Sequence, residues 1–217
     1  MLDRLLDLVF PASSLSGCPG VWLTEEERTM LRAHPIRLEG VPLLKAGLPA
    51  VDRLVAAASY GSSPLLREAI RRLKYRRVSA YDDALGAMLT DASRFLPEWP
   101  AAVLCPVPLH WSRRFVRGFN QAEVLAAMIT TARGWSMRSL LVRTRATGAQ
   151  AKRTVPERRR ALCGAFAWNV SESAVPPRVI LVDDVVTSGA TLNACAMSLR
   201  EAGVSHVDAI TLAVAFA

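Results

Sequence analysis

The sequence predicts an α/β domain with a mostly parallel sheet flanked by helices, and a small irregular appendage at its N-terminus. From residue 63 onward, short apolar runs alternate with amphipathic helical stretches, and the apolar runs have no polar face. Strands that are apolar on both faces are typical of parallel sheets covered by helices on both sides. The first 55 residues instead contain five prolines and four glycines, which interrupt long elements.

The appendage is predicted to span residues 1–58, and the main domain residues 59–217. Near the start of the chain, leucines recur at helical spacing with charged residues between them, which suits a short amphipathic helix and not a secretory signal. Thr24 followed by Glu27 is a capping-box pattern and predicts a helix at 25–33. This region shows little core of its own.

The main domain shows regular element signals in sequence. Ser63 can cap a helix beginning at Pro64, whose buried stripe is Leu66, Ile70 and Leu73. Gly203 ends the last predicted helix. The further predicted elements are a helix at 82–95, a strand at 101–107, a helix at 121–132, strands at 140–143 and 178–183, a helix at 190–202 and a strand at 207–214.

The net charge of +8 is concentrated in a few segments. Residues 143–160 hold seven basic residues and one acid, a local charge of +6. Two further basic clusters lie at residues 67–77 and 113–117. Such concentration indicates an anionic partner, either the phosphates of a small molecule or a nucleic-acid backbone, although a solvated basic face gives the same pattern.

The cysteines and the hydropathy pattern bound the class of protein. The four cysteines, Cys18, Cys105, Cys163 and Cys195, form no C-x-x-C pair, so neither a metal site nor a disulfide framework is supported and buried reduced thiols are expected. No apolar run reaches the ~18 residues that a membrane span requires. The sequence therefore predicts a cytoplasmic protein without a membrane span.

The chemistry is carried by residues 179–191, VILVDDVVTSGAT. The first four residues form a predicted buried strand, and Asp183 and Asp184 stand where it leaves the sheet, at the edge where open α/β folds bind ligands. A predicted helix start follows, and its unpaired backbone N–H groups and dipole make an anion site. Gly189 lets the backbone approach that anion closely.

The residue types divide a ligand between the two halves of this segment. Asp183 and Asp184 would repel a phosphate but suit a ribose diol, because a carboxylate accepts hydrogen bonds from two neighbouring hydroxyls, and they can also favour a divalent cation. The hydroxyls of Thr187, Ser188 and Thr191 add donors for a monophosphate. Two plainer interpretations stay open: an ordinary turn with a capping Ser or Thr, and a magnesium site of the phosphoreceiver type. A Walker loop is excluded, because no G-x-x-x-x-G-K-[ST] occurs.

This segment closely resembles the phosphoribosyl-diphosphate (PRPP) signature of type I phosphoribosyltransferases, and three other stretches resemble the ComF family. These are the basic run LREAIRRLKY that ends at Tyr75, PVPL at 106–109 with Arg113, Arg114 and RGFNQ at 117–121, and Gln150 with ERR at 157–159 and GAF at 164–166. The resemblance extends from about Tyr60 to the C-terminus. ComF-like proteins are associated with DNA uptake in competence, so the resemblance implies a role in that process.

Two features depart from the family pattern. ComF proteins usually carry a four-cysteine zinc finger after the N-terminal helix, whereas residues 10–36 keep only Cys18. Because a structural zinc takes four ligands, we predict no zinc. The family also usually has an asparagine where this chain has Ala161, so a role for that side chain is not carried over.

The resemblance implies PRPP with Mg²⁺ as the ligand, the metal lying near Asp183 and Asp184. Those two acids would hold the ribose hydroxyls, and residues 187–191 would hold the 5′-phosphate. Arg113, Arg114 and Arg117 match the family's pyrophosphate loop, although solvation explains any single arginine equally well. The expected ligand-binding residues are Val182, Asp183, Asp184, Val185, Val186, Thr187, Ser188, Gly189, Ala190, Thr191, Arg113, Arg114 and Arg117.

The basic segment 143–160 resembles the mobile catalytic loop of the family, since it is long and contains glycine, proline and threonine. Gln150, Lys152 and Arg158 are its candidate residues. With Asp183 and Asp184, Lys152 and Arg158 complete the predicted catalytic set.

Two functional hypotheses follow. The first is a phosphoribosyltransferase that acts on an acceptor the sequence does not identify. The second is a non-catalytic module that senses PRPP or a nucleotide and engages single-stranded DNA or a DNA-uptake protein. Trp111, Phe115 and Phe119 interleave with arginines and could stack bases, although core packing explains them as well. Dimers are common among similar proteins, which makes a homodimer a candidate assembly.

Overall fold

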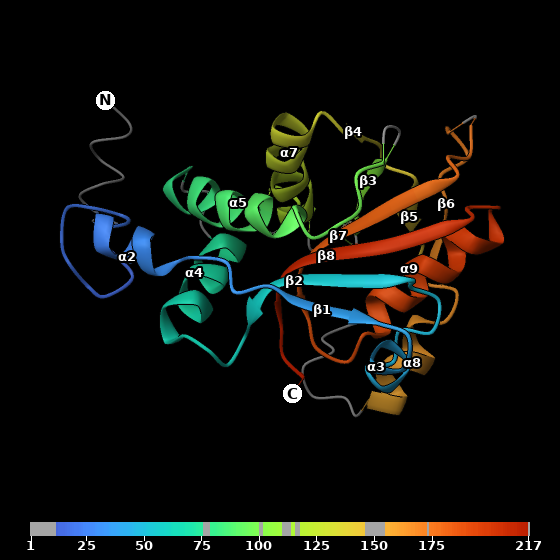
Figure 1. The fold of residues 1–217 in the computed structure, drawn as a ribbon, viewed down its shortest axis with the longest axis horizontal. Coiled ribbons are helices and arrows are strands. Elements are labelled where there is room, and N and C mark those ends of the chain that lie inside the picture. Colours follow the sequence, from blue (N-terminus) through green and yellow to red (C-terminus); the bar gives the residue numbers. More distant parts are fainter. Residues whose placement is uncertain are drawn as a thin grey trace.

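A six-stranded sheet organises the protein (Figure 1). The computed structural model describes residues 12–75, 79–99, 102–109, 114–115, 118–145, 155–172 and 174–216. The sheet has the order β1-β2-β8-β7-β3-β4, and a separate two-stranded pair is formed by β5 and β6. β1 is antiparallel to β2, and the other four pairings in the large sheet are parallel. The predicted α/β fold with a mostly parallel sheet is confirmed.

The elements follow one another in this order. They are α2 (Glu25–Met30), β1 (Ile36–Glu39), α3 (Val41–Lys45), β2 (Arg53–Ser59), α4 (Pro64–Tyr75), α5 (Ser79–Ser93), β3 (Val103–Pro106), α7 (Gln121–Arg133), β4 (Ser136–Met137), β5 (Leu141–Arg143), α8 (Val155–Leu162), β6 (Phe166–Trp168), β7 (Arg178–Val186), α9 (Ala190–Glu201) and β8 (His206–Val214).

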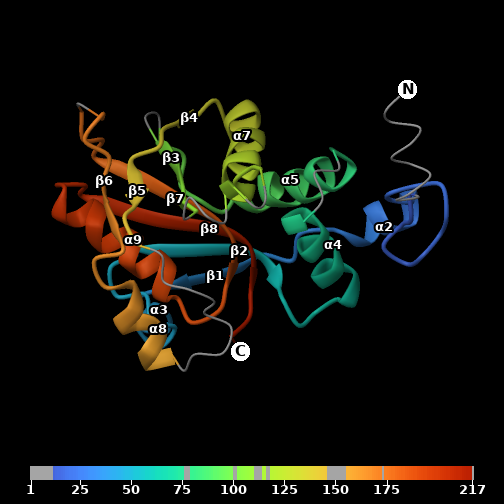
Figure 2. The same cartoon turned by 180° about the vertical axis from the view of Figure 1, so that it is seen from behind.

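Helices cover the sheet on both faces. Successive residues of a strand point to opposite faces, so each strand contributes side chains to both helix layers. Ile180 and Val182 of β7 join a core with α4, α5 and α7, whereas Val179 and Leu181 join a second core with α3, α8 and α9. Figure 1 shows α5 and α7 on the near face, and Figure 2 shows α3, α8 and α9 from the other side. The apolar runs without a polar face are explained by burial in these two layers.

Most predicted elements are present, with shifted ends. The capping box of Thr24 and Glu27 starts α2 as expected, but the helix ends at Met30 because Leu31 leaves the helical conformation (ψ 61°). Ser63 caps α4 by accepting the N–H of Leu66 at 3.3 Å. β7 was predicted to end at 183 and instead continues to Val186, because it keeps pairing with β8 beyond the two acids.

The strand β2 was not predicted, because the prolines and glycines in the first 55 residues of the chain indicated an irregular appendage there. β2 lies between β1 and β8, and five of its seven residues are buried. The sheet therefore includes strands on both sides of the predicted boundary at residue 58. Whether that boundary separates two domains stays a prediction.

Glu27 organises the segment in which a zinc finger would be expected. Its Oε1 accepts hydrogen bonds from the Ser14 hydroxyl at 2.8 Å and from the Ser16 N–H at 2.6 Å, and its Oε2 accepts the Thr24 N–H at 2.9 Å. Burial raises the pKa of this carboxyl, but a hydrogen bond from the Ser16 hydroxyl at 2.6 Å and the three just described outweigh it and lower the pKa to about 2. An ionised carboxylate at 3% exposure thus holds the loop together.

The segment's only cysteine, Cys18, is exposed and lies with its Sγ 3.9 Å from the Ser16 hydroxyl. Among the described residues, no group of three or more His, Cys, Asp and Glu side chains is arranged to hold a metal ion. That the protein binds no zinc stays a prediction.

The other cysteines divide between core and surface. Burial raises the pKa of Cys105 to about 12, and it also raises the pKa of Cys195, so both thiols stay protonated and unreactive. Cys163 is exposed like Cys18, so the expectation of buried thiols was wrong for these two residues. No helix in the described part of the chain has the length and apolar character to cross a membrane.

Asp208 is an acid inside the sheet. It lies on β8 between Val207 and Ala209, which face the α9 layer, so its side chain faces the α5 and α7 layer. It is 2% exposed, and among the described residues its Oδ2 has no hydrogen-bond partner. Burial raises the pKa of this carboxyl to about 7, and the nearby Arg53 and Arg178 oppose that rise.

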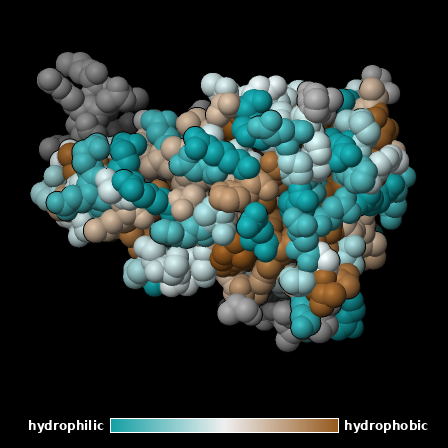
Figure 3. Space-filling model, in the orientation of Figure 1, coloured by the Kyte–Doolittle hydropathy of each residue, from teal (hydrophilic) through white to brown (hydrophobic). Residues whose placement is uncertain are grey.

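The surface seen from the side of Figure 1 is mostly hydrophilic (Figure 3). A hydrophobic patch lies at the lower right, where Figure 1 draws α3. The exposed apolar residues of this helix are Val41 and Leu44, at 62% and 59%. The buried residue of α3 is Leu43, which anchors the helix on the α9 side of the sheet.

Candidate functional site

The two acids lie where the sheet opens at the end of β3. β3 pairs with β7 only as far as Val182, whose carbonyl accepts the N–H of Val107 at 2.9 Å. Asp183 still pairs with Thr211 on the β8 side, but on its β3 side the described residues form no further strand pair. Asp183 and Asp184 therefore lie beyond the last β3–β7 pair, at the carboxyl edge where open α/β folds bind ligands.

Both carboxylates are half-buried and held by the backbone. The Oδ1 of Asp183 accepts the N–H of Asp184 at 2.9 Å, and the Oδ1 of Asp184 accepts the N–H of Val185 at 2.7 Å. These contacts fix the orientation of each carboxylate before a ligand arrives, which lowers the cost of binding. Asp183 lines a small cavity of about 30 Å³ together with residues 185–192. Asp183 thus faces this cavity, and the Asp184 side chain is also partly exposed.

Residues 187–191 connect β7 to α9 and are called the phosphate loop below, after the ligand that the sequence predicts for them. Gly189 has a left-handed backbone (φ 69°) and occupies the N-cap of α9, which leaves the first turn without a side-chain cap. The N–H groups of that turn are therefore available to an anion, and the helix dipole favours negative charge there. The expected ligand-binding residues from Asp183 to Thr191 all belong to this one strand, loop and helix start.

The predicted pyrophosphate loop follows β3. Arg113 and Arg117 lie outside the described residues. Arg114 is described, and its guanidinium pairs with the Glu123 carboxylate at 3.1 Å on the surface. An exposed pair of this kind contributes little to stability, so Arg114 can exchange it for an anion.

Asn120, at the base of that loop, was named in the sequence analysis only as part of RGFNQ at 117–121 and was given no role there. This residue is 3% exposed, and its Nδ2 donates to the Val107 carbonyl at 3.1 Å while its Oδ1 accepts the N–H of Ala122 at 3.1 Å. It caps α7 and ties the helix to the residue after β3 in one step. An asparagine just before an apolar helical stretch is an N-cap signal, which could have indicated the cap but not the second contact.

The basic segment 143–160 forms most of the connection between the two strands of the β5–β6 hairpin. That connection contains α8, a helix that was not predicted. Thr144 and Ala165 close the hairpin through a backbone hydrogen bond of 2.9 Å. Arg143 stacks over Phe166 at 5.3 Å, so it packs the hairpin. Gln150 and Lys152 lie outside the described residues, as does the side chain of Arg158. Their catalytic roles stay predictions.

The basic helix α4 is partly neutralised within the protein. Glu68 pairs with Arg71 and Arg72 at 2.7 Å each, and these hydrogen bonds lower its pKa to about 2. Arg72 also donates to the Tyr81 hydroxyl at 2.7 Å, which ties α4 to α5. Arg71 remains 65% exposed. This cluster is therefore in part structural, and not simply an anion-binding face.

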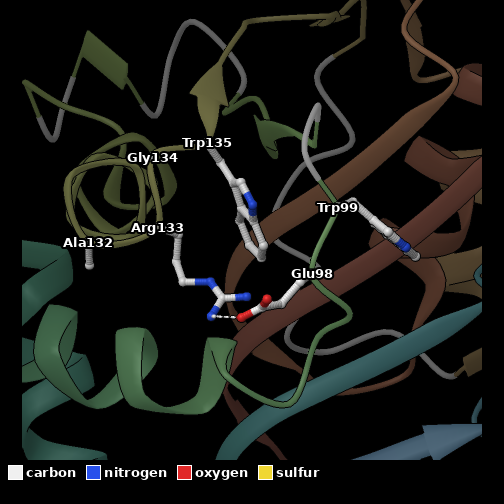
Figure 4. Close-up of a pocket in the computed structure, with 6 residues that line it drawn as sticks. All are labelled: Glu98, Trp99, Ala132, Arg133, Gly134 and Trp135. Carbon is white, nitrogen blue, oxygen red and sulfur yellow. Dashed lines mark ion pairs between the residues drawn. The ribbon is translucent and has the colours of Figure 1, made fainter.

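A larger cavity of about 520 Å³ lies elsewhere (Figure 4). Its walls come from the segments just before β3 and just before β4, so it lies at the amino edge of the parallel strands. In Figure 4 the Arg133 guanidinium meets the Glu98 carboxylate, at 3.9 Å, and stacks on Trp135 at 4.6 Å, whereas Trp99 points away. This cavity lies at the opposite edge of the sheet from Asp183 and Asp184, so it is not part of the candidate site despite its larger volume.

The strand order, the acid pair and the phosphate loop together define a type I phosphoribosyltransferase-like fold. A scan against models of known protein families gave no match. Individual proteins do match. Competence protein F of Haemophilus influenzae is 33% identical over 178 residues, covering 76% of this chain and 74% of that protein.

Two further relatives agree. DNA utilization protein YhgH of Salmonella typhimurium is 32% identical over 183 residues, covering 81% of this chain and 77% of that protein. Competence protein ComFC of Bacillus subtilis is 32% identical over 157 residues, covering 70% of this chain and 61% of that protein. The chain belongs to the ComF family.

Proposed function

We propose that this protein binds PRPP with Mg²⁺ and transfers its phosphoribosyl group to an acceptor that is still to be identified. The observation that supports this most directly is the pair of oriented carboxylates of Asp183 and Asp184, followed at once by an uncapped helix N-terminus. Acids suit the ribose hydroxyls, and the helix start suits the 5′-phosphate. In this proposal, the segment from Asp183 to the start of α9 holds both the ribose hydroxyls and the 5′-phosphate of the same molecule.

In the proposed reaction, the bond between the anomeric carbon and the pyrophosphate oxygen breaks, and its electron pair leaves with the pyrophosphate. A lone pair of the acceptor forms the new bond to that carbon. The charge that develops on the sugar resembles an oxocarbenium ion, which carboxylates close to the ribose stabilise. Carboxylate oxygens also suit Mg²⁺, and the ion would help neutralise the diphosphate.

Replacing both acids is expected to abolish transfer. The variant Asp183→Asn with Asp184→Asn keeps the side-chain shapes but removes two negative charges, so we expect at least a ~100-fold lower rate. The measurement is pyrophosphate release with Mg²⁺, PRPP and a panel of nucleobases and amines. The matched control is Asp83→Asn with Asp91→Asn, which removes the same charge from exposed positions of α5 and should leave the rate unchanged.

If no acceptor gives more pyrophosphate than the Asp183→Asn, Asp184→Asn variant, the enzymatic proposal is wrong. A thermal melt of each variant shows whether the fold is retained. Loss of activity in a variant that melts like the wild type assigns the effect to the site.

A second candidate function is binding of single-stranded DNA. The printed names of the relatives concern competence and DNA utilization, and the net charge of +8 suits a nucleic-acid backbone. Three phosphate contacts would make the affinity for a single strand fall about 20-fold between 50 and 200 mM salt. A fluorescence-anisotropy titration at several salt concentrations measures this slope. Absence of binding at the lowest salt would remove this function.

A further inference from the structure

The turn that follows α3, residues 46–50, lies against the phosphate loop. Figures 1 and 2 both draw α3 beside the start of α9. The contact joins distant parts of the sequence, since Ala50 and Asn193 are 143 residues apart. The turn belongs to the N-terminal region, and the loop belongs to the proposed ligand site.

The first contact is a close approach of two backbones at Gly189. A Cβ atom added there would lie 2.6 Å from the Ala46 carbonyl oxygen and 2.9 Å from the Leu48 Cγ. Both distances are shorter than carbon contacts found in proteins, so the loop and the turn fit together only because residue 189 has no side chain. Leu48 is fully buried, so moving its side chain aside would disturb the packed core around it.

The second contact is made by Asn193 in the first turn of α9. Its N–H donates to the Gly189 carbonyl at 2.9 Å, and its side-chain Oδ1 accepts the N–H of Ala50 at 2.9 Å. One residue thus holds the loop glycine and the turn together. The turn itself is closed by hydrogen bonds from the N–H of Leu48 to the Leu43 carbonyl at 2.9 Å and from the N–H of Ala46 to the Pro42 carbonyl at 3.0 Å.

We propose that the turn at residues 46–50 positions the phosphate loop, and that Asn193 is the positioning residue that couples them. This inference rests on the proposed PRPP binding. Ordering a free loop costs about 1–2 kcal/mol per residue, so a loop that is ordered in advance binds its ligand more tightly. The N-terminal region therefore contributes to phosphate binding without touching the phosphate.

The test compares two contacts that α9 makes with the segment joining α3 to β2. Asn193→Leu removes the acceptor for Ala50 next to the phosphate loop. Arg200→Ala is the matched control, because the Arg200 guanidinium pairs with the Asp52 carboxylate at 2.6 Å near the other end of α9. For Asn193→Leu we expect about 10-fold weaker binding of Mg²⁺–PRPP by isothermal titration calorimetry, and for Arg200→Ala we expect unchanged affinity.

A second measurement needs no ligand. Hydrogen exchange of the amides at residues 187–191 should be faster in Asn193→Leu than in the wild type, and unchanged in Arg200→Ala. Asn193→Asp keeps an acceptor oxygen at the same place and should retain the slow exchange. Equal exchange in the wild type and Asn193→Leu, or equal acceleration in Asn193→Leu and Arg200→Ala, would overturn the positioning role. If the wild type binds no PRPP, the proposed function fails, while the exchange rates still decide the positioning role.

Discussion

Gly189→Ala is expected to abolish PRPP binding and to destabilise the protein. Alanine in a left-handed conformation costs about 1–2 kcal/mol, and the backbone at this residue has φ 69°. The new methyl group would also lie 2.6 Å from the Ala46 carbonyl oxygen, so the loop or the turn must move. Because the clash displaces the loop that would hold the phosphate, we expect PRPP binding at least ~100-fold weaker by calorimetry, a loss of about 2.8 kcal/mol.

Gly134→Ala is the matched control for backbone strain. Gly134 ends α7 with nearly the same left-handed backbone, φ 66°, and a Cβ added there meets no atom within 4 Å. It should lower the melting temperature by the strain alone and leave PRPP affinity unchanged. If Gly189→Ala binds PRPP as Gly134→Ala does, the phosphate loop does not depend on the close approach to the turn.

Asp208→Asn is expected to stabilise the protein at pH 8 and to have little effect at pH 4. The folded-state pKa of Asp208 is about 7, above the value of 3.8 for an unperturbed aspartate. The folded state thus holds the proton more tightly, so the contribution of Asp208 is most favourable below pH 3.8 and is lost as the pH rises to 7. The shift corresponds to about 4 kcal/mol, which the neutral asparagine avoids.

The measurement is urea unfolding of variant and wild type at several pH values, because the difference between them cancels other titrating groups. Glu27→Gln serves as the control with the opposite sign. The pKa of Glu27 is lowered from 4.5 to about 2, so its contribution is present above pH 4.5 and is lost as the pH falls toward 2. Glu27→Gln should therefore destabilise by about 3 kcal/mol at pH 7. A pH-independent difference for Asp208→Asn would contradict the raised pKa.

Local sequence signals predicted those parts of the fold in which neighbours along the chain determine the structure. The cap of Ser63 on α4 and the capping box of Thr24 and Glu27 act within three or four residues, and both are present. The acid pair and phosphate loop could be predicted for the same reason, since strand, loop and helix start are continuous in residues 179–191. Their relative placement follows from the parallel topology.

Elements whose formation depends on partners distant in the sequence were not predicted. β2 lies next to prolines and glycines in sequence, and it becomes a buried strand only because β1 and β8 pair with it on either side. The helix α8 lies largely in the segment that was predicted to be a mobile catalytic loop, and the β5–β6 hairpin fixes the two ends of the connection that contains it.

The sequence by itself determined the fold class and the strand, loop and helix start at residues 179–191, because hydrophobic periodicity and a thirteen-residue motif act through nearest neighbours along the chain. Only the tertiary structure decided what supports that site. The contact of Asn193 with Ala50 and the place of Leu48 against Gly189 arise when the N-terminal region folds onto α9. A hydrogen bond between residues so far apart leaves no periodic pattern in one sequence, so packing alone could reveal it.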